Sequence, residues 1–340
     1  MSSKVERIFA GPALKVGNFL DKFPKIYNVW FIASISTIAG LMFGFDISSM
    51  SAFIGAKPYA EYFNNPGSTL QGFITAAMAL GSTFGSIASS FVSEPFGRRL
   101  SLLICSLFWI VGASIQSASQ NTSMLIAGRI ISGLGVGFGS SVAPIYGAEI
   151  SPRKRRGAVN GLFQMSIAMG IMIMFYFATV LVTSREVGWG FQIVPGVLLF
   201  FGCFIIPESP RWLAKQGRWE QSEMIVSKIQ ARGNSEDEEV LIEIAEIKEQ
   251  LLIDKEAKSV GYATLFKKKF ILRTFTAIFA QIWQQLTGMN VMMYYIVYIF
   301  QMAGYSGDAN LVASSIQYVL FVACTIPALF FLTSLVEGQC

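Results

Sequence analysis

Eight long apolar stretches constrain the fold of this chain more than any other feature of its sequence. The hydrocarbon core of a bilayer is about 30 Å thick and takes about 20 residues of helix to cross. Only 14% of the residues are charged, whereas soluble domains carry about 25%. Hydrocarbon cannot hydrogen-bond a bare amide, so stretches of this length are expected to be helical. The sequence therefore predicts an all-α polytopic membrane protein, with spans at residues 29–54, 70–92, 100–119, 124–148, 158–182, 189–206, 271–302 and 311–332.

Basic residues gather on one side of this arrangement. All but three of the 26 Lys and Arg residues fall in segments that the order of the spans places on the same side of the membrane. The positive-inside rule then puts the N-terminus in the cytoplasm, and the net charge of +5 needs no nucleic-acid partner. Residues 1–28 are expected to form a mobile cytoplasmic arm without a cleaved signal peptide. Residues 207–270 are expected to form a cytoplasmic linker between the sixth and seventh spans.

The linker carries an amphipathic pattern. Val240, Ile244, Ile247 and Leu251 recur at helical spacing with Glu and Lys between them, which predicts short amphipathic helices. Six acidic residues fall within residues 236–246, and we interpret them as a solvated face.

The residue types disfavour an enzyme. The sequence has no His, no carboxylate pair within a span and no metal-ligand cluster, so no metal and no cofactor is expected. Four alternating glycines, Gly133 to Gly139, superficially match a dinucleotide-binding loop. They follow no strand and lie inside an apolar span, so they predict close helix packing instead.

Neutral amides interrupt the apolar seventh span. Gln281, Gln284 and Gln285 share one face at about 100° per residue, and a row of amides suits a ligand made of hydroxyls. On a straight helix Asn290 points away from that face. It joins the others only if the helix breaks near residues 287–288, as in the discontinuous helices of transporters. The alternative is that the amides hold neighbouring helices together.

Two charged residues are expected at lipid depth, Asp46 in the first span and Arg129 in the fourth. At a rise of 1.5 Å per residue, Asp46 lies about 26 Å from the inner end of its span and Arg129 about 8 Å from the outer end. Both fall in the outer half, so we expect them within ion-pair reach. A carboxylate that pairs with arginine in one state and is protonated in another could carry a proton; a purely structural ion pair is the alternative.

Several motifs together resemble the sugar porters of the major facilitator superfamily, most of all the fungal high-affinity glucose transporters. The match extends to about residue 332, and PESPRWL together with QQLTGMN is highly specific. The motifs are GFD at 44–46, GRR at 97–99, Arg129 with its glycine run, PIYGAE at 144–149, RG at 156–157, PESPRWL at 207–213, QQLTGMN at 284–290 and YY at 294–295.

The resemblance implies a fold and a function. The fold is the major facilitator fold, with a complete six-helix N-terminal half at residues 29–206 and the first two helices of the C-terminal half at residues 271–332. The function is hexose transport across the plasma membrane by proton symport. A uniporter and a sugar sensor that does not transport are the alternatives, and the sequence leaves open which hexose is preferred.

The resemblance also implies roles for single residues. Sugar hydroxyls would be bound by Gln164, Gln284, Gln285 and Asn290. An outer gate would be closed by Tyr294 and Tyr295, and proton coupling would rest on Asp46 and Arg129. A cytoplasmic latch, meaning ion pairs that are formed in one state and broken in the other, would come from Glu94, Arg98, Arg99, Glu149, Arg153, Arg156 and Glu208.

The sequence departs from the family pattern at a few positions. Glu94-Pro95 stands where relatives have Asp-Arg, which removes a basic partner. Ile171 and Phe321 stand where many relatives carry an amide. Residues 333–340 read TSLVEGQC where relatives continue with four more spans. We therefore expect the 340-residue chain not to transport sugar on its own.

Overall fold

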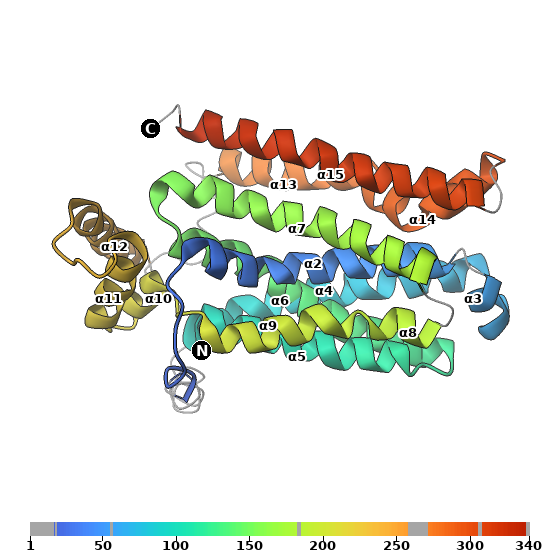
Figure 1. The fold of residues 1–340 in the computed structure, drawn as a ribbon, viewed down its shortest axis with the longest axis horizontal. Coiled ribbons are helices and arrows are strands. Elements are labelled where there is room, and N and C mark those ends of the chain that lie inside the picture. The colour runs from blue at the N-terminus through green and yellow to red at the C-terminus, as the bar shows by residue number, and fades with distance from the viewer. Residues whose placement is uncertain are drawn as a thin grey trace.

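The computed structural model describes residues 17, 19–54, 57–181, 185–257, 271–304 and 308–337. Its long helices lie side by side in one bundle, and α10 (Pro210–Lys215), α11 (Trp219–Gln230) and α12 (Glu238–Ala257) extend from one end of it (Figure 1). We call this end the α12 end, and the opposite end, where the short helix α3 (Lys57–Tyr62) lies, the α3 end. Seven of the described helices are long and apolar enough to cross a membrane.

The six spans expected between residues 29 and 206 are all present. The first coincides with its expected range, the fifth ends in the π-helical turn η2 (Phe177–Leu181), and the sixth consists of two helices, α8 and α9. The expected alternation of long helices and short connections is therefore confirmed. The helices are α2 (Val29–Ile54), α4 (Ser68–Phe96), α5 (Arg98–Ser117), α6 (Thr122–Ile150), α7 (Arg156–Tyr176), α8 (Arg185–Gly190) and α9 (Ile193–Ile205), with the 3-10 turn η1 (Arg153–Arg155) before α7.

Glycine lets the helices of this half approach one another closely. A Cβ atom on Gly137 of α6 would overlap the backbone of α4 at Ser82. A Cβ atom on Gly44 of α2 would likewise overlap the backbone of α7 at Ile167. The glycine run in α6 therefore packs helices together, as its place inside an apolar span predicts.

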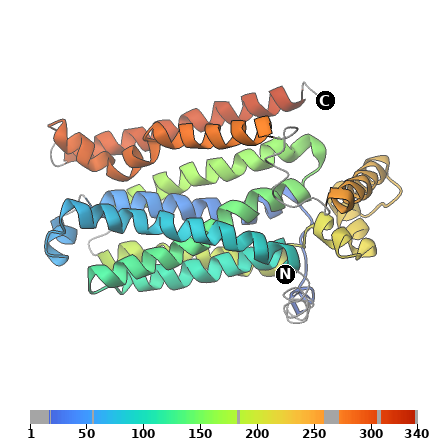
Figure 2. The same cartoon turned by 180° about the vertical axis from the view of Figure 1, so that it is seen from behind.

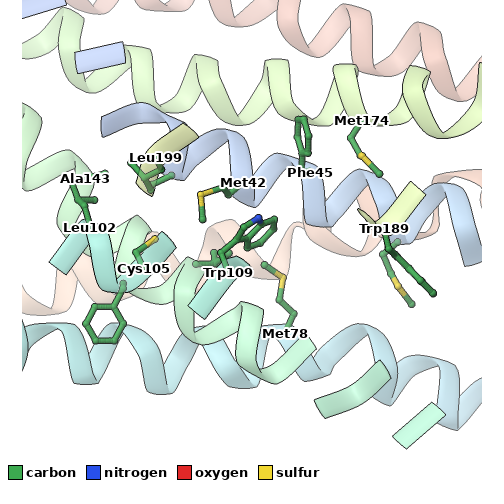
Figure 3. Close-up of a cluster of buried hydrophobic side chains, with 14 of the residues drawn as sticks. Met42, Phe45, Met78, Leu102, Cys105, Trp109, Ala143, Met174, Trp189 and Leu199 are labelled. Carbon is green, nitrogen blue, oxygen red and sulfur yellow. The ribbon is translucent and has the colours of Figure 1, made fainter. Parts of the chain in front are cut away.

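Large apolar side chains fill the interior of the six-helix half (Figure 3). Met42 and Phe45 of α2, Met78 of α4 and Trp109 of α5 are all buried. Trp109 donates from its indole nitrogen to the backbone carbonyl of Gln192 at 2.6 Å, so its single polar atom is satisfied. This half is thus a close-packed frame for the polar side chains that α2 and α6 carry.

The linker folds into helices of its own at the α12 end (Figure 2). Val240, Ile244 and Ile247 of α12 are buried against Ala214 of α10 and Val226 of α11. The amphipathic helix predicted from their spacing is therefore confirmed, while residues 258–270 lie outside the described part of the chain. The helices are α10 (Pro210–Lys215), α11 (Trp219–Gln230) and α12 (Glu238–Ala257).

Three helices follow the linker and lie along the α7 side of the bundle (Figure 1). The seventh span is broken into α13 (Ile271–Leu286) and α14 (Met289–Met302), and Gly288 between them has a left-handed φ of 74°. The predicted irregularity near residues 287–288 is confirmed, and because it leaves two helices of 16 and 14 residues, this span is not among the seven of membrane-crossing length. The last helix, α15 (Asp308–Glu337), runs beside α7.

The described part of the N-terminal arm packs against the α12 end. Leu20 is 2% exposed. The ammonium of Lys25 donates to the carbonyl of Leu20 at 2.8 Å and to that of Phe204, near the end of α9, at 2.6 Å. These contacts join residues 20 and 25 to the end of α9, while residues 1–16 and 18 of the expected arm lie outside the described part of the chain.

Candidate functional site

The two charges expected at lipid depth form an ion pair. Arg129 donates from Nη2 to Oδ2 of Asp46 at 3.0 Å, and both side chains are fully buried. The prediction that they lie within ion-pair reach is confirmed. Removing one partner of such a pair costs about 3–5 kcal/mol, because the other charge stays buried without compensation.

This pair has unused hydrogen-bonding capacity. Oδ1 of Asp46 and the Nε and Nη1 atoms of Arg129 are buried without a hydrogen-bond partner. The hydroxyl of Tyr294 on α14 faces the Asp46 carboxylate. One oxygen of this buried carboxylate is free, and the neighbouring helix α14 belongs to the other half. A movement of α14 can therefore change whether the carboxylate is charged or protonated.

Tyrosines of α14 close the α3 end against the six-helix half. The Tyr295 hydroxyl donates to Oγ1 of Thr75 on α4 at 3.1 Å. The Tyr298 hydroxyl donates to the backbone carbonyl of Ile54 at 3.2 Å and accepts from the Gln71 amide at 3.1 Å. Sequence reasoning missed Tyr298, although it follows Tyr294 by four residues and so lies on the same face of a helix.

Met78 and Tyr318 take part in three further hydrogen bonds near this end. Tyr294 donates to the sulfur of Met78 at 3.7 Å. Tyr318 of α15 is fully buried, shares a hydrogen bond of 3.0 Å with Ser51 of α2 and donates to the carbonyl of Met293 at 3.2 Å. Helices α14 and α15 are therefore joined to α2 and α4 by tyrosine hydroxyls at this end.

The break in the seventh span brings two of the expected sugar ligands together. The Asn290 amide donates to Oε1 of Gln285 at 2.7 Å across the turn at Gly288. On an unbroken helix these two side chains would point in different directions. Gln284, next to Gln285, is exposed and lies at the end of an open groove on α13.

Gln164 is not joined to these amides by any hydrogen bond in the described residues. It is exposed on α7, and Gly161, one turn earlier, lies against Leu329 of α15. The structure therefore groups Gln285 with Asn290 and leaves Gln164 on a separate helix nearer the α12 end. Phe321 packs on the apolar cluster that includes Tyr318.

The expected latch residues meet at the α12 end, with partners that the sequence identified only in part. Arg98 donates to both carboxylate oxygens of Glu149 at 2.9 Å. Glu94 pairs with Lys215 of α10 at 2.6 Å. The basic partner that Glu94-Pro95 lacks in the local sequence therefore comes from the linker.

The acidic stretch of α12 supplies further partners. Glu243 is 7% exposed and accepts from Arg156 at 2.5 Å and from Arg211 at 3.3 Å. Glu246 pairs with Arg153 at 2.7 Å. The interpretation of this stretch as a solvated face is wrong for these two residues, because α12 docks on the basic turn before α7.

Glu208 differs from the expected ion pair with arginine. Its carboxylate accepts from the backbone amides of Arg98 at 2.9 Å, Arg99 at 3.2 Å and Ser209 at 2.9 Å. It therefore caps the N-terminus of α5, which favours negative charge. Burial raises the pKa of Glu208, while these amides and the nearby Arg99 act to lower it.

Gly97 makes room for this cap. Its φ of 87° and ψ of 171° lie in a region that essentially only glycine adopts. A Cβ atom there would lie 2.5 Å from Oε2 of Glu208. The GRR motif (97–99) and the PESPR motif (207–211), which are far apart in the sequence, are thus joined by hydrogen bonds from backbone amides to the Glu208 carboxylate.

Within the described residues, no group of three His, Cys, Asp or Glu side chains could hold a metal ion.

Comparisons with known proteins show which family the chain belongs to. The family model described as sugar (and other) transporter matches residues 32–335. The high-affinity glucose transporter 1 of Candida albicans is 71% identical over 98% of this chain and 62% of its own length. The galactose-proton symporter of Escherichia coli K12 is 34% identical over 83% of this chain and 59% of its own length.

A solved structure agrees with the fold. The proton:xylose symporter XylE of the major facilitator superfamily, bound to 6-bromo-6-deoxy-D-glucose, superposes with a TM-score of 0.76 at 27% identity. The match covers 89% of this chain and 68% of that chain.

The fold and the site define a multi-pass membrane protein of the major facilitator superfamily. The chain belongs to the sugar (and other) transporter family, which is a family of transporters and not of enzymes. It spans about 62% of the length of its Candida albicans relative.

Proposed function

We propose that the protein carries a hexose across the plasma membrane together with a proton, with its N-terminus in the cytoplasm. The observation that carries this proposal is the broken seventh span, which places the amides of Gln285 and Asn290 in contact. Together with Gln284, and with Gln164 on α7, they offer donors and acceptors to sugar hydroxyls. The names of the Candida albicans and Escherichia coli relatives support hexoses as the substrate class.

Asp46 is proposed as the proton carrier and Arg129 as its counter-charge. Tyr294 links this pair to the substrate site, because it faces Asp46 from the same helix that begins at the break. When α14 swings away from the six-helix half, its tyrosines leave and Asp46 is opened to solvent. Binding of sugar at the break and protonation of Asp46 then act on the same moving helix.

The arrangement of the halves supports an inward-facing state. At the α3 end the tyrosines join α14 to α2 and α4. Towards the α12 end, α13 buries none of its described residues. We propose that the α12 end is cytoplasmic and that the ion pairs of Arg153 and Arg156 with α12 hold the linker to the first half as it rocks.

The test is uptake in cells that lack their own hexose carriers. The chain is joined at Leu332 to the C-terminal residues of the Candida albicans relative that it does not cover, and the 340-residue chain is tested beside it. Saturable uptake of labelled glucose by the joined protein, with a rise in external pH when glucose is added, is expected. The chain by itself is expected to show no saturable uptake.

The variant Asp46→Asn separates the alternatives. It is expected to abolish the rise in external pH, whereas Glu61→Gln, an exposed acidic residue of α3, should leave it unchanged. Uptake without any pH change in the unmodified protein would identify a uniporter. Binding without uptake would identify a sensor, and either result would contradict proton symport.

A further inference from the structure

Two adjoining cavities lie at the α12 end, away from the proposed hexose site. Their volumes are about 250 and 230 Å³, smaller than the pockets that hold drug-sized ligands. Asp21, Arg99 and Glu208 line both of them, so they meet at these side chains. The other polar residues of their walls are Gln216 and Arg218 in the first cavity and Lys25, Tyr27 and Gln221 in the second.

Arg99 presents an unused donor at this junction. Its side chain is 2% exposed, and Nη1 donates to Oδ1 of Asp21 at 3.0 Å. Nη2 is buried without any hydrogen-bond partner. Leaving a buried charged donor unpaired is costly, so this atom points to an acceptor that the described residues do not supply.

Asp21 shows that the site takes an oxyanion. Its carboxylate lies between two guanidinium groups, accepting from Arg99 at 3.0 Å and from Arg218 at 3.3 Å. Asp21 is 41% exposed and belongs to the chain before α2, so it can turn outward without disturbing a helix. The position between the two arginines is therefore open to a competing anion.

The charges around the junction favour an anion with more than one negative charge. Lys25 stands beside Arg99 and uses two of its three N–H groups on backbone carbonyls. The Glu208 carboxylate is turned to three backbone amides, so its charge is already compensated. Of the two carboxylates that line both cavities, Asp21 is the one that is not compensated by backbone amides in the described residues. It faces three cationic side chains, those of Arg99, Arg218 and Lys25.

We propose that this junction binds a phosphate monoester, with the phosphate between Arg99 and Arg218 in place of Asp21. Guanidinium groups hold phosphate through two parallel N–H bonds, and Nη2 of Arg99 supplies a donor that Asp21 does not use. The side-chain amides of Gln216 and Gln221 on the two walls suit hydroxyls. A sugar phosphate therefore fits both cavities better than inorganic phosphate does.

The phosphate group could come from a soluble sugar phosphate or from a lipid headgroup, and two sets of probes distinguish these sources. The purified chain is placed in nanodiscs of phosphatidylcholine, and binding of radiolabelled glucose 6-phosphate and of inorganic phosphate is measured. A second set of nanodiscs contains phosphatidylinositol 4-phosphate, whose binding is measured by lipid retention. Saturable binding at or below about 1 mM in either arm supports the proposal, and the arm that binds identifies a soluble or a lipid source. Absence of saturable binding in both arms overturns it.

Variants place the site. Asp21→Asn removes the competing carboxylate and is expected to tighten binding by about threefold to tenfold, whereas Arg218→Gln should weaken it at least about tenfold. Arg232→Gln, an exposed arginine after α11 that lines neither cavity, is the matched control and should change nothing.

Asp21→Asn and Arg218→Gln are expected to change the binding affinity in opposite directions. Misfolding would weaken binding in both variants, so it cannot produce this result. Unchanged or weaker binding in Asp21→Asn, or unchanged binding in Arg218→Gln, would overturn the proposed site.

Discussion

Replacing Gly97 by alanine should destabilise the protein far more than a glycine substitution usually does. The backbone at Gly97 has φ 87° and ψ 171°, and forcing alanine into such a region costs about 1–3 kcal/mol. The new Cβ atom would also lie 2.5 Å from Oε2 of Glu208. The carboxylate must then move and lose one or more of its amide hydrogen bonds, each worth about 1.5–3 kcal/mol for a charged acceptor.

Together these terms predict a loss of about 3–6 kcal/mol. At about 2 °C per kcal/mol for a large domain, the unfolding temperature should fall by about 6–12 °C. The assay is thermal unfolding of the purified protein in detergent, followed by tryptophan fluorescence. Trp212 is a suitable reporter because its indole nitrogen donates to the carbonyl of Glu94, which immediately precedes Pro95 and Phe96 at the end of α4.

Two control variants separate the causes. Gly217 also has a positive φ, 79°, but an added Cβ would meet nothing within 4 Å, so Gly217→Ala reports backbone strain alone. Gly72 lies inside α4 with equally open space, and Gly72→Ala should be neutral or slightly stabilising.

A double variant then isolates the contact with Glu208. In a Glu208→Ala background the cost of Gly97→Ala should shrink to that of Gly217→Ala, because the clash is gone. If Gly97→Ala on its own lowers the unfolding temperature no more than Gly217→Ala does, the proposed contact between GRR and PESPR is refuted.

Three further predictions follow from the α12 and α3 ends. Glu243→Gln should loosen α12 and raise its hydrogen exchange, because Glu243 forms ion pairs with two arginines. Glu249→Gln, at an exposed position of α12, should leave the exchange unchanged, and equal exchange in the two variants would contradict the docking of α12. Tyr298→Phe should open the α3 end, measured as faster labelling of a cysteine placed at Gln71. That cysteine already removes the hydrogen bond from Gln71, so the variant tests the remaining one to Ile54; unchanged labelling would argue against this closure. Burial, followed by the neighbouring Arg99, lowers the pKa of Lys25 from 10.5 to about 8. The folded protein therefore binds fewer protons than the unfolded chain between about pH 8 and 10.5, and stability relative to Lys25→Gln should rise over that window; a fall would refute the burial of the ammonium. The other titratable groups that face Lys25 are Asp21, Glu208 and Cys203.

The sequence carried enough information to predict the bundle and the centre of the site. Apolar length locates helices because lipid leaves the backbone no other partner. The polar residues within the seventh span predicted its break, since Asn290 could not otherwise reach the face of Gln285. The isolation of Asp46 and Arg129 in hydrocarbon predicted their pairing, because neither charge is tolerated there alone.

The partners at the α12 end could not be derived in the same way. Solvent satisfies a charged residue on a surface helix, so the pattern of α12 does not reveal that Glu243 is buried against Arg156 and Arg211. The amide ligands of Glu208 depend on the turn geometry at Gly97, which no spacing rule encodes. The same holds for Lys215, which lies 121 residues from its partner Glu94.

The central claim is that the amides at the break in the seventh span hold sugar hydroxyls. The most direct measurement is the affinity of labelled glucose for the joined protein and for its Gln285→Ala variant, with Gln301→Ala, an exposed amide at the far end of α14, as the control. Loss of one hydrogen bond between Gln285 and the sugar should weaken glucose binding by about 1–3 kcal/mol, or about fivefold to 150-fold, while the control keeps its affinity. Equal affinity for glucose in Gln285→Ala and in the unmodified protein would contradict the account.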